Sequence, residues 1–225
     1  MAGGDRLPGW VSLLRAPNPG PMTLDGTNTW IVDGRICIDP GPDDQGHLAA
    51  IGPVAAILIT HGHPDHIDGV PGLIELTGAQ VVTAVPGVEV LATPGHTADS
   101  ACFVVDRDGT RAVFTGDTIL GRGTTVVAWP DGDLGAYLAS LRLLAGFDGV
   151  LGLPGHGPVI PDVGIAARAY LSHREQRLDQ VRAALAAGAE TAEDVVDIVY
   201  ADVDPDVRFA AVWSVRAQLA YLGRP

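Results

Sequence analysis

The sequence predicts an α/β protein with a small all-helical part at its carboxyl end. Strand-like runs are mixed with helical patterns up to about residue 160, after which only helical patterns follow. Clusters of polar residues rich in histidine come directly after several strand-like runs, as catalytic loops do in layered α/β proteins. We therefore expect a catalytic domain over residues 1–161 and a helical domain over 162–225.

The elements expected in the first half are short. They are strands at 27–34 and 35–41 around an Asp33-Gly34 turn, an apolar strand at 54–60, a helix at 69–79, and strands at 80–85 and 88–95.

The second half begins with a strand pair and then turns helical. The expected elements are strands at 100–106 and 111–117 around Asp108-Gly109, a helix at 134–147 with leucines at helical spacing, a strand in 149–157 that ends in a loop, and helices at 163–187, 191–200 and 205–222. Thr191 and Asp194 predict a capping box at the start of the second tail helix.

Composition limits the classes of function. Hydrophobic residues make up 47 % of the 225 residues, which is enough for a substantial core. The net charge of −13 argues against a protein that coats nucleic-acid backbones, because that binding depends on positive charge. No apolar run approaches the roughly 20 residues of a membrane span, and no secretory signal is visible. We expect a cytoplasmic protein without a membrane partner, in which Cys37 and Cys102 are buried thiols.

The segment HGHPDH at 61–66 predicts metal ligands. His61 and His63 are two residues apart in an extended segment, so their side chains point the same way. Pro64 suits the first turn of a helix, from which Asp65 and His66 can face a neighbouring position. Imidazole and carboxylate groups are ligands of zinc-like ions, and a cation offsets the cost of crowding them.

Three further ligand candidates follow glycines in loops at strand ends: His96, Asp117 and His156. A carboxylate such as Asp117 can bridge two ions about 3.5–4 Å apart. Asp39 also ends a strand, and we expect it to orient a ligand histidine.

The ordered motifs HGHPDH, PGHT, TGD and PGHG resemble those of the metallo-β-lactamase superfamily over roughly residues 23–161. The resemblance implies an αββα sandwich with the metal site at the shared edge of two sheets. It also implies that His61, His63 and His96 bind one ion, that Asp65, His66 and His156 bind a second, and that Asp117 bridges them.

Other segments, among them TLDGTNTWIVDG and YLSHREQRLDQV, are similar to the β-lactamase-like protein 2 group, which carries a winged-helix-like domain at its carboxyl end. Relatives in this group usually have a longer connection before the strand that ends in ATPGH, whereas here Pro86-Gly87 joins the two strands almost directly.

These residues predict a metal-dependent hydrolase in which Asp65 and Asp117 also have catalytic roles. Two Zn²⁺ ions are expected, with Mn²⁺ or Fe²⁺ as alternatives, and the hydroxide that they hold is the expected nucleophile. Arg122 and Thr124, just beyond Asp117, are candidates for substrate contact.

The substrate stays open between an ester or thioester and a phosphodiester such as single-stranded RNA, which the resemblance implies for some relatives. A glyoxalase II-like thioesterase is an alternative, and an oxygen-dependent enzyme with one iron is another. A nucleic-acid-binding regulator would need a basic tail, but residues 165–225 hold 7 arginines against 9 acids, so we expect no stable binding of duplex DNA. The arginines of the helix at 163–187 form a solvated face, a homodimer surface or an interdomain surface.

Overall fold

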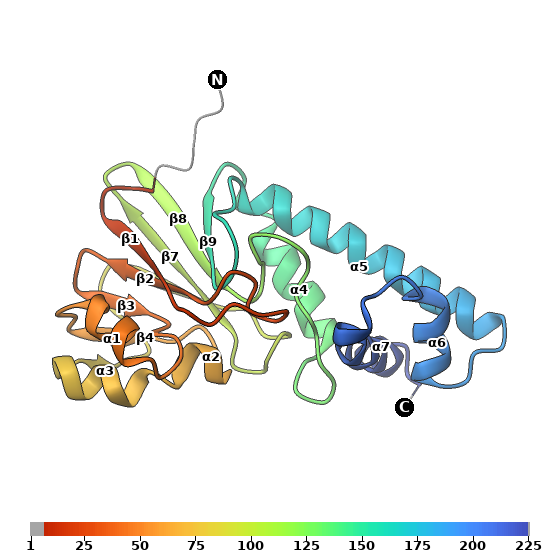
Figure 1. The fold of residues 1–225 in the computed structure, drawn as a ribbon. Coiled ribbons are helices and arrows are strands. Elements are labelled where there is room, and N and C mark those ends of the chain that lie inside the picture. Colours follow the sequence, from red (N-terminus) through yellow and green to blue (C-terminus); the bar gives the residue numbers. More distant parts are fainter. Residues whose placement is uncertain (1–6, 225) are drawn as a thin grey trace, which may run out of the picture.

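Residues 7–224 are described by the structure, a computed structural model, in which two β-sheets stack face to face (Figure 1). The first sheet has the order β1 (Val11–Arg15), β2 (Asn28–Val32), β3 (Ile36–Ile38), β4 (Ala56–Leu58) and β5 (Gln80–Val81). β1, β2 and β3 pair antiparallel, whereas β3, β4 and β5 pair parallel. The predicted turn joins β2 to β3, and Asp33 and Gly34 both have the positive φ of a tight hairpin.

The second sheet has the order β6 (Val88–Ala92), β7 (Ala101–Arg107), β8 (Thr110–Gly116) and β9 (Leu151–Pro154). β6 and β8 both pair antiparallel with β7, and β9 pairs parallel with β8. Strands β6, β8 and β9 therefore point the same way, so their carboxyl ends share one edge of the sheet.

Alternation along the strands builds three apolar layers. Trp30 of β2 and Phe114 of β8 meet between the sheets with ring centroids 6.1 Å apart. Ile31, the neighbour of Trp30, points to the opposite face and packs in the layer under α1 (Gln45–Ile51) and α3 (Val70–Thr77). The outer face of the second sheet is covered by α4 (Leu134–Leu144) and α5 (Val163–Ala186). This is the predicted sandwich of two sheets between helices.

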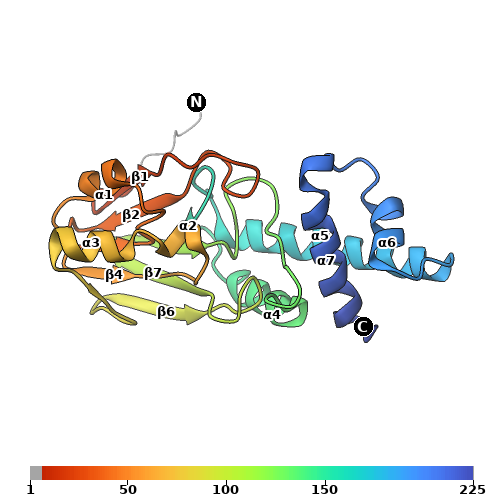
Figure 2. The same cartoon turned by 60° about the horizontal axis from the view of Figure 1, so that its bottom comes forward.

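The tail continues from α5 into α6 (Ala192–Val199), a 3₁₀ turn (Pro205–Val207) and α7 (Arg208–Tyr221). Figure 2 shows α6 and α7 beyond the sheets, along the far part of α5. Val181 of α5, Val195 of α6 and Val215 of α7 belong to a fourth apolar cluster. Tyr170 and Leu178 of α5 instead pack in the layer on the second sheet, so this helix belongs to two cores. The boundary at 161/162 and the winged-helix-like character of the tail stay predictions.

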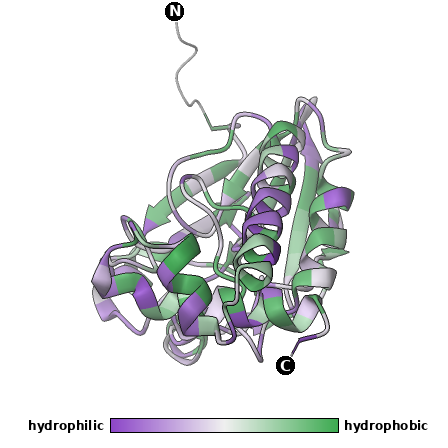
Figure 3. Cartoon of the chain, turned by 90° about the vertical axis from the view of Figure 1, so that its right-hand side faces the viewer, coloured by the Kyte–Doolittle hydropathy of each residue, from purple (hydrophilic) through white to green (hydrophobic). Residues whose placement is uncertain are grey.

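The colouring by hydropathy in Figure 3 follows this layering. The strands are largely green, whereas the helices seen in front of them carry both colours, as expected for helices with one face in the core. Among the described residues, no helix has the length and apolar character needed to cross a lipid bilayer.

Several sequence predictions are confirmed locally. The Thr191 capping box is present, Cys37 and Cys102 are buried free thiols, and the helices expected at 69–79, 134–147 and 163–187 exist.

Other predictions were wrong in extent. The strand expected at 80–85 is only the exposed pair Gln80–Val81, because Val82–Gly87 crosses from one sheet to the other. The strand at 54–60 is limited to 56–58, and β1 and α1 were not predicted. The Pro86-Gly87 connection is a tight turn closed by the Val88 amide, which donates to the Val85 carbonyl over 3.0 Å.

Leu141→Ala is expected to lower the free energy of unfolding by about 2–5 kcal/mol, because Leu141 is fully buried in α4 against the second sheet. Leu143 lies on the same helix with 47 % of its surface exposed, so Leu143→Ala should change stability by less than about 0.5 kcal/mol. Urea denaturation of both variants measures the difference. Equal losses would contradict this placement of α4.

Candidate metal centre

The polar residues singled out in the sequence gather where five strands end. Asp39 follows β3 and His61 follows β4 in the first sheet. His96 follows β6, Asp117 follows β8 and His156 follows β9 in the second sheet. In each sheet the strands that carry these residues run parallel to one another, so their carboxyl ends reach the same edge. Neither sheet alone supplies all the residues of the cluster.

Close approach at this edge depends on glycine. A Cβ added to Gly116 would lie 2.6 Å from the Cβ of Thr60, and one added to Gly155 would lie 2.5 Å from Oδ1 of Asp117. Real side chains do not tolerate such contacts, so these two positions let the sheets bring their loops together. The two glycines come directly before the ligand candidates Asp117 and His156.

Three histidines form the first donor set. Nε2 of His61 and Nε2 of His96 each lie 3.0 Å from Nδ1 of His63. His61 and His96 are buried, and the His63 side chain is 36 % exposed. One ring nitrogen from each residue thus points to a common position, as three ligands of one ion do.

Asp65, His66 and His156 form the second donor set. Nε2 of His156 lies 3.2 Å from Nε2 of His66 and 3.1 Å from Oδ2 of Asp65. The short helix α2 (Pro64–Ile67) begins with Pro64, and it turns Asp65 and His66 away from the first set, as predicted. His66 and His156 are fully buried.

Asp117 lies between the two sets. Its Oδ2 is 3.8 Å from Nε2 of His96 and 3.4 Å from Nε2 of His156. Its Oδ1 is buried without a hydrogen-bond partner and lies 3.5 Å from Nε2 of His66. Asp117 therefore faces both donor sets, which is the position of a bridging carboxylate.

Hydrogen bonds on the outer side of the rings fix two tautomers in the first set. Nδ1 of His96 donates to the Val126 carbonyl oxygen over 2.8 Å. The single hydroxyl proton of Thr60 is donated to Asp39 over 2.6 Å, so Nδ1 of His61 must donate to Thr60 over 3.0 Å. Nε2 of His61 and Nε2 of His96 therefore each carry a lone pair and no proton.

This pattern of lone pairs suits a cation. Nδ1 of His63 can hold one proton and can donate it to one of the two Nε2 lone pairs, so the other lone pair has no donor. A divalent cation accepts all three lone pairs at once, and the donor set has the imidazole chemistry that zinc prefers.

Burial and charge act differently on the two sets. Burial lowers the pKa of His61 and of His96, so both rings are neutral at pH 7. Burial also opposes charge on His156, but the carboxylates of Asp117 and Asp65 outweigh it and raise the pKa of His156 to about 10. The carboxylates of the second set thus stabilise a positive charge beside them. Without metal this charge is the proton on His156, and a bound metal would displace that proton.

Asp39 lies behind the second set. Its Oδ2 accepts from Nδ1 of His66 over 2.8 Å, and its Oδ1 accepts from the Thr60 amide over 2.7 Å. The Asp39 backbone has φ 53°, a left-handed conformation that Asp and Asn adopt more readily than most residues. Asp39 therefore orients His66 directly, through Nδ1 of that ring. It also orients His61 indirectly, through the Thr60 hydroxyl.

Two residues at the site, Thr60 and Asp131, were not predicted from the sequence. Thr60 is the last residue before the histidine cluster, and its place between a strand and a ligand is a signal that could have been used. Asp131 lies 3.4 Å from Nε2 of His63 on the loop after Val127, and its sequence setting gives no such signal.

The two predicted substrate contacts are Arg122 and Thr124, and other interactions are seen for both. Both terminal nitrogens of Arg122 donate to the carboxylate of Asp25 over 2.8 and 2.9 Å, so this guanidinium is already paired. Thr124 lines a cavity toward the C-terminal helices. Contact of either residue with substrate stays a prediction.

Comparison with known proteins agrees with this site. Residues 34–99 match a family model described as beta-lactamase superfamily domain, and residues 80–156 match the metallo-beta-lactamase superfamily. A beta-lactamase-like protein 2 homolog from Caenorhabditis elegans is 32 % identical, with 97 % of this chain and 85 % of that protein covered. An atrochrysone carboxyl ACP thioesterase from Aspergillus chevalieri is 34 % identical, with 91 % and 80 % covered.

A solved structure shares the fold. The beta-lactamase domain protein from Burkholderia ambifaria superposes with a TM-score of 0.78 at 22 % identity, covering 97 % of this chain and 87 % of that chain. Together with the clustered histidines and aspartates, these relatives show that the chain belongs to the metallo-β-lactamase superfamily and is one of its hydrolases.

Proposed function

We propose that this protein holds two divalent cations, with zinc as the expected metal, and hydrolyses thioesters of small acyl groups. The observation that carries the proposal is the pair of convergent donor sets, each with a ring nitrogen close to Asp117. The first cation would be held by His61, His63 and His96, the second by Asp65, His66 and His156, and both by Asp117. When bound, such cations lower the pKa of a water molecule and polarise an acyl oxygen.

The protein residues supply orientation and a proton acceptor. Asp39 and the Val126 carbonyl hold the outer nitrogens of His66 and His96, so the inner nitrogens keep one direction. Asp65 has a side chain that is 29 % exposed and a lowered pKa, so its carboxylate is ionised at neutral pH. A carboxylate at the open side of the site can accept a proton from the attacking water and return it to the leaving thiolate.

The choice of a thioester has two supports. The Aspergillus chevalieri relative is named as a thioesterase and aligns with most of this chain. In addition, the net charge of −13 disfavours a polyanionic substrate.

Single-stranded RNA is the second candidate substrate. It is favoured by the similarity to the Caenorhabditis elegans beta-lactamase-like protein 2 homolog, which covers nearly the whole chain. A two-cation site can activate water toward a phosphoryl group as well as toward a carbonyl group.

Asp39→Asn is expected to weaken metal binding about 10–100-fold, because it removes the negative charge behind His66 while an asparagine tolerates the left-handed backbone. Competition with a chromogenic chelator measures the metal affinity. Asp43→Asn is the matched control, since Asp43 is an exposed residue of the same loop whose side chain accepts a hydrogen bond from the exposed Gln45 side chain. Equal affinities in the two variants would show that Asp39 does not support the site.

The metal-loaded protein should hydrolyse acyl N-acetylcysteamine thioesters, lose this activity in EDTA and regain it with Zn²⁺. Asp65→Asn should lower kcat about 10²–10⁴-fold because it removes both the proton acceptor and a carboxylate that would hold the second cation, whereas Asp68→Asn at the exposed end of the same short helix should not. Thiol release followed by Ellman's reagent measures the rates. Cleavage of a labelled RNA oligonucleotide by a protein that leaves thioesters intact would overturn the thioester proposal.

A further inference from the structure

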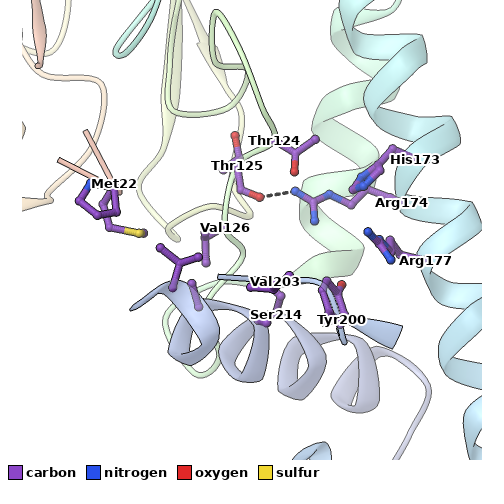
Figure 4. Close-up of a pocket in the computed structure, with 14 residues that line it drawn as sticks. Met22, Thr124, Thr125, Val126, His173, Arg174, Arg177, Tyr200, Val203 and Ser214 are labelled. Atoms are coloured by element: carbon purple, nitrogen blue, oxygen red, sulfur yellow. Dashed lines mark hydrogen bonds between the residues drawn. The ribbon is translucent and has the colours of Figure 1, made fainter. Parts of the chain in front are cut away.

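A cavity of about 320 Å³ lies between the loops of the catalytic sheets and the C-terminal helices (Figure 4). Met22 and Val126 line it from the catalytic side. Arg174 and Arg177 of α5 and Ala211 of α7 line it from the helical side. The cavity is therefore built by segments that are far apart in the sequence.

The wall of this cavity is shared with the metal centre. The Val126 carbonyl accepts from Nδ1 of His96 over 2.8 Å, and the Thr125 hydroxyl donates to the Asp117 carbonyl over 2.7 Å. Thr125 and Val126 also line the cavity. A group in the cavity is thus separated from the ligand residues by the thickness of one chain segment.

Arg174 is a buried cation in this wall. Its side chain is only 4 % exposed, it donates through one terminal nitrogen to the Thr125 carbonyl, and its guanidinium carbon lies 5.4 Å from the centre of the Tyr137 ring. Its Nε atom is buried and has no hydrogen-bond partner. The prediction of a solvated arginine face on this helix was wrong for Arg174, because its guanidinium lies against Thr125 and Tyr137 of the predicted catalytic domain. These contacts agree with the alternative of an interdomain surface.

Arg177 stands one turn further along α5. Its guanidinium lies over the Tyr200 ring at 4.6 Å and donates to the Val199 carbonyl and to Gln180. Among the described residues, neither Arg174 nor Arg177 forms an ion pair, although Arg168 and Arg182 of the same helix pair with Asp148 and Asp179. Two positive charges without acidic partners therefore face one cavity in a protein whose net charge is −13.

The rest of the lining adds a hydrogen-bonding group and apolar surface. Nδ1 of His173 is buried without a partner, and burial together with Arg174 and Arg177 lowers the pKa of His173, so the ring is neutral at pH 7. Apolar contacts come from Met22, Val126 and the small residues of α7, and no carboxylate lines the cavity in the described part of the chain. The lining thus fits an apolar body that ends in an anion.

We propose that this cavity binds a small carboxylic acid with an apolar body, and that the guanidinium of Arg177 donates hydrogen bonds to its carboxylate while the buried charge of Arg174 strengthens the attraction. The inference goes beyond the proposed thioesterase function, because none of the candidate metal ligands lines this cavity. Guanidinium groups bind carboxylates through charge-assisted hydrogen bonds, which are stronger inside a partly buried cavity than in water.

Direct binding tests the cavity without any reaction. Calorimetry compares hexanoate with hexanamide, a neutral ligand of similar shape, on the metal-loaded protein. We expect hexanoate to bind at least about tenfold more tightly, the typical effect of one charge-assisted hydrogen bond. Arg177→Gln should reduce the preference to about twofold or less, and Arg177→Lys should keep part of it. Arg182→Gln, on the exposed face of the same helix, is the matched control and should change nothing. A preference that survives in Arg177→Gln would place the carboxylate elsewhere, for example on the cations, and would overturn the proposal.

Discussion

The structure depends on the crowding of unprotonated ring nitrogens at one buried point. The outer nitrogen of His96 is fixed by a carbonyl group and that of His61 by the Thr60–Asp39 pair, so both inner nitrogens present lone pairs toward His63. One proton cannot satisfy both contacts, and burial keeps the rings of His61 and His96 from taking up protons at pH 7. A divalent cation removes the conflict, which makes metal binding part of the stability of this edge as well as of its chemistry.

The fold supplies this crowding by combining two sheets. His61, His63 and His66 come from the first sheet, and His96, Asp117 and His156 come from the second, so the distances between ligands depend on how the sheets stack. The contact of Trp30 with Phe114 in the central layer helps to fix that stacking. Gly116 and Gly155 then allow loops at the shared edge to approach more closely than side chains would permit. The stacking of the two sheets thus determines the geometry of the site.

The sequence was most informative where polar residues break an apolar pattern. The seven ligand candidates and Asp39 stood out because each follows a strand-like run, and the structure brings all of them to one edge. The short helix α1 and the strand β1 could not be predicted from periodicity, since seven and five residues are too few to show a pattern among prolines and glycines. The burial of Arg174 and the contact of Asp131 with His63 depend on how distant segments meet, which local spacing does not contain.

The central claim is that two cations share this edge. Its most direct test is the metal content of the purified protein after loading with Zn²⁺ and removal of free metal, measured by inductively coupled plasma mass spectrometry. The account predicts two zinc ions per chain, because Oδ2 of Asp117 lies within 3.8 Å of a ring nitrogen from each of the two donor sets. A single tightly bound metal per chain under the same conditions, with Asp65, His66 and His156 left to protons, would contradict it.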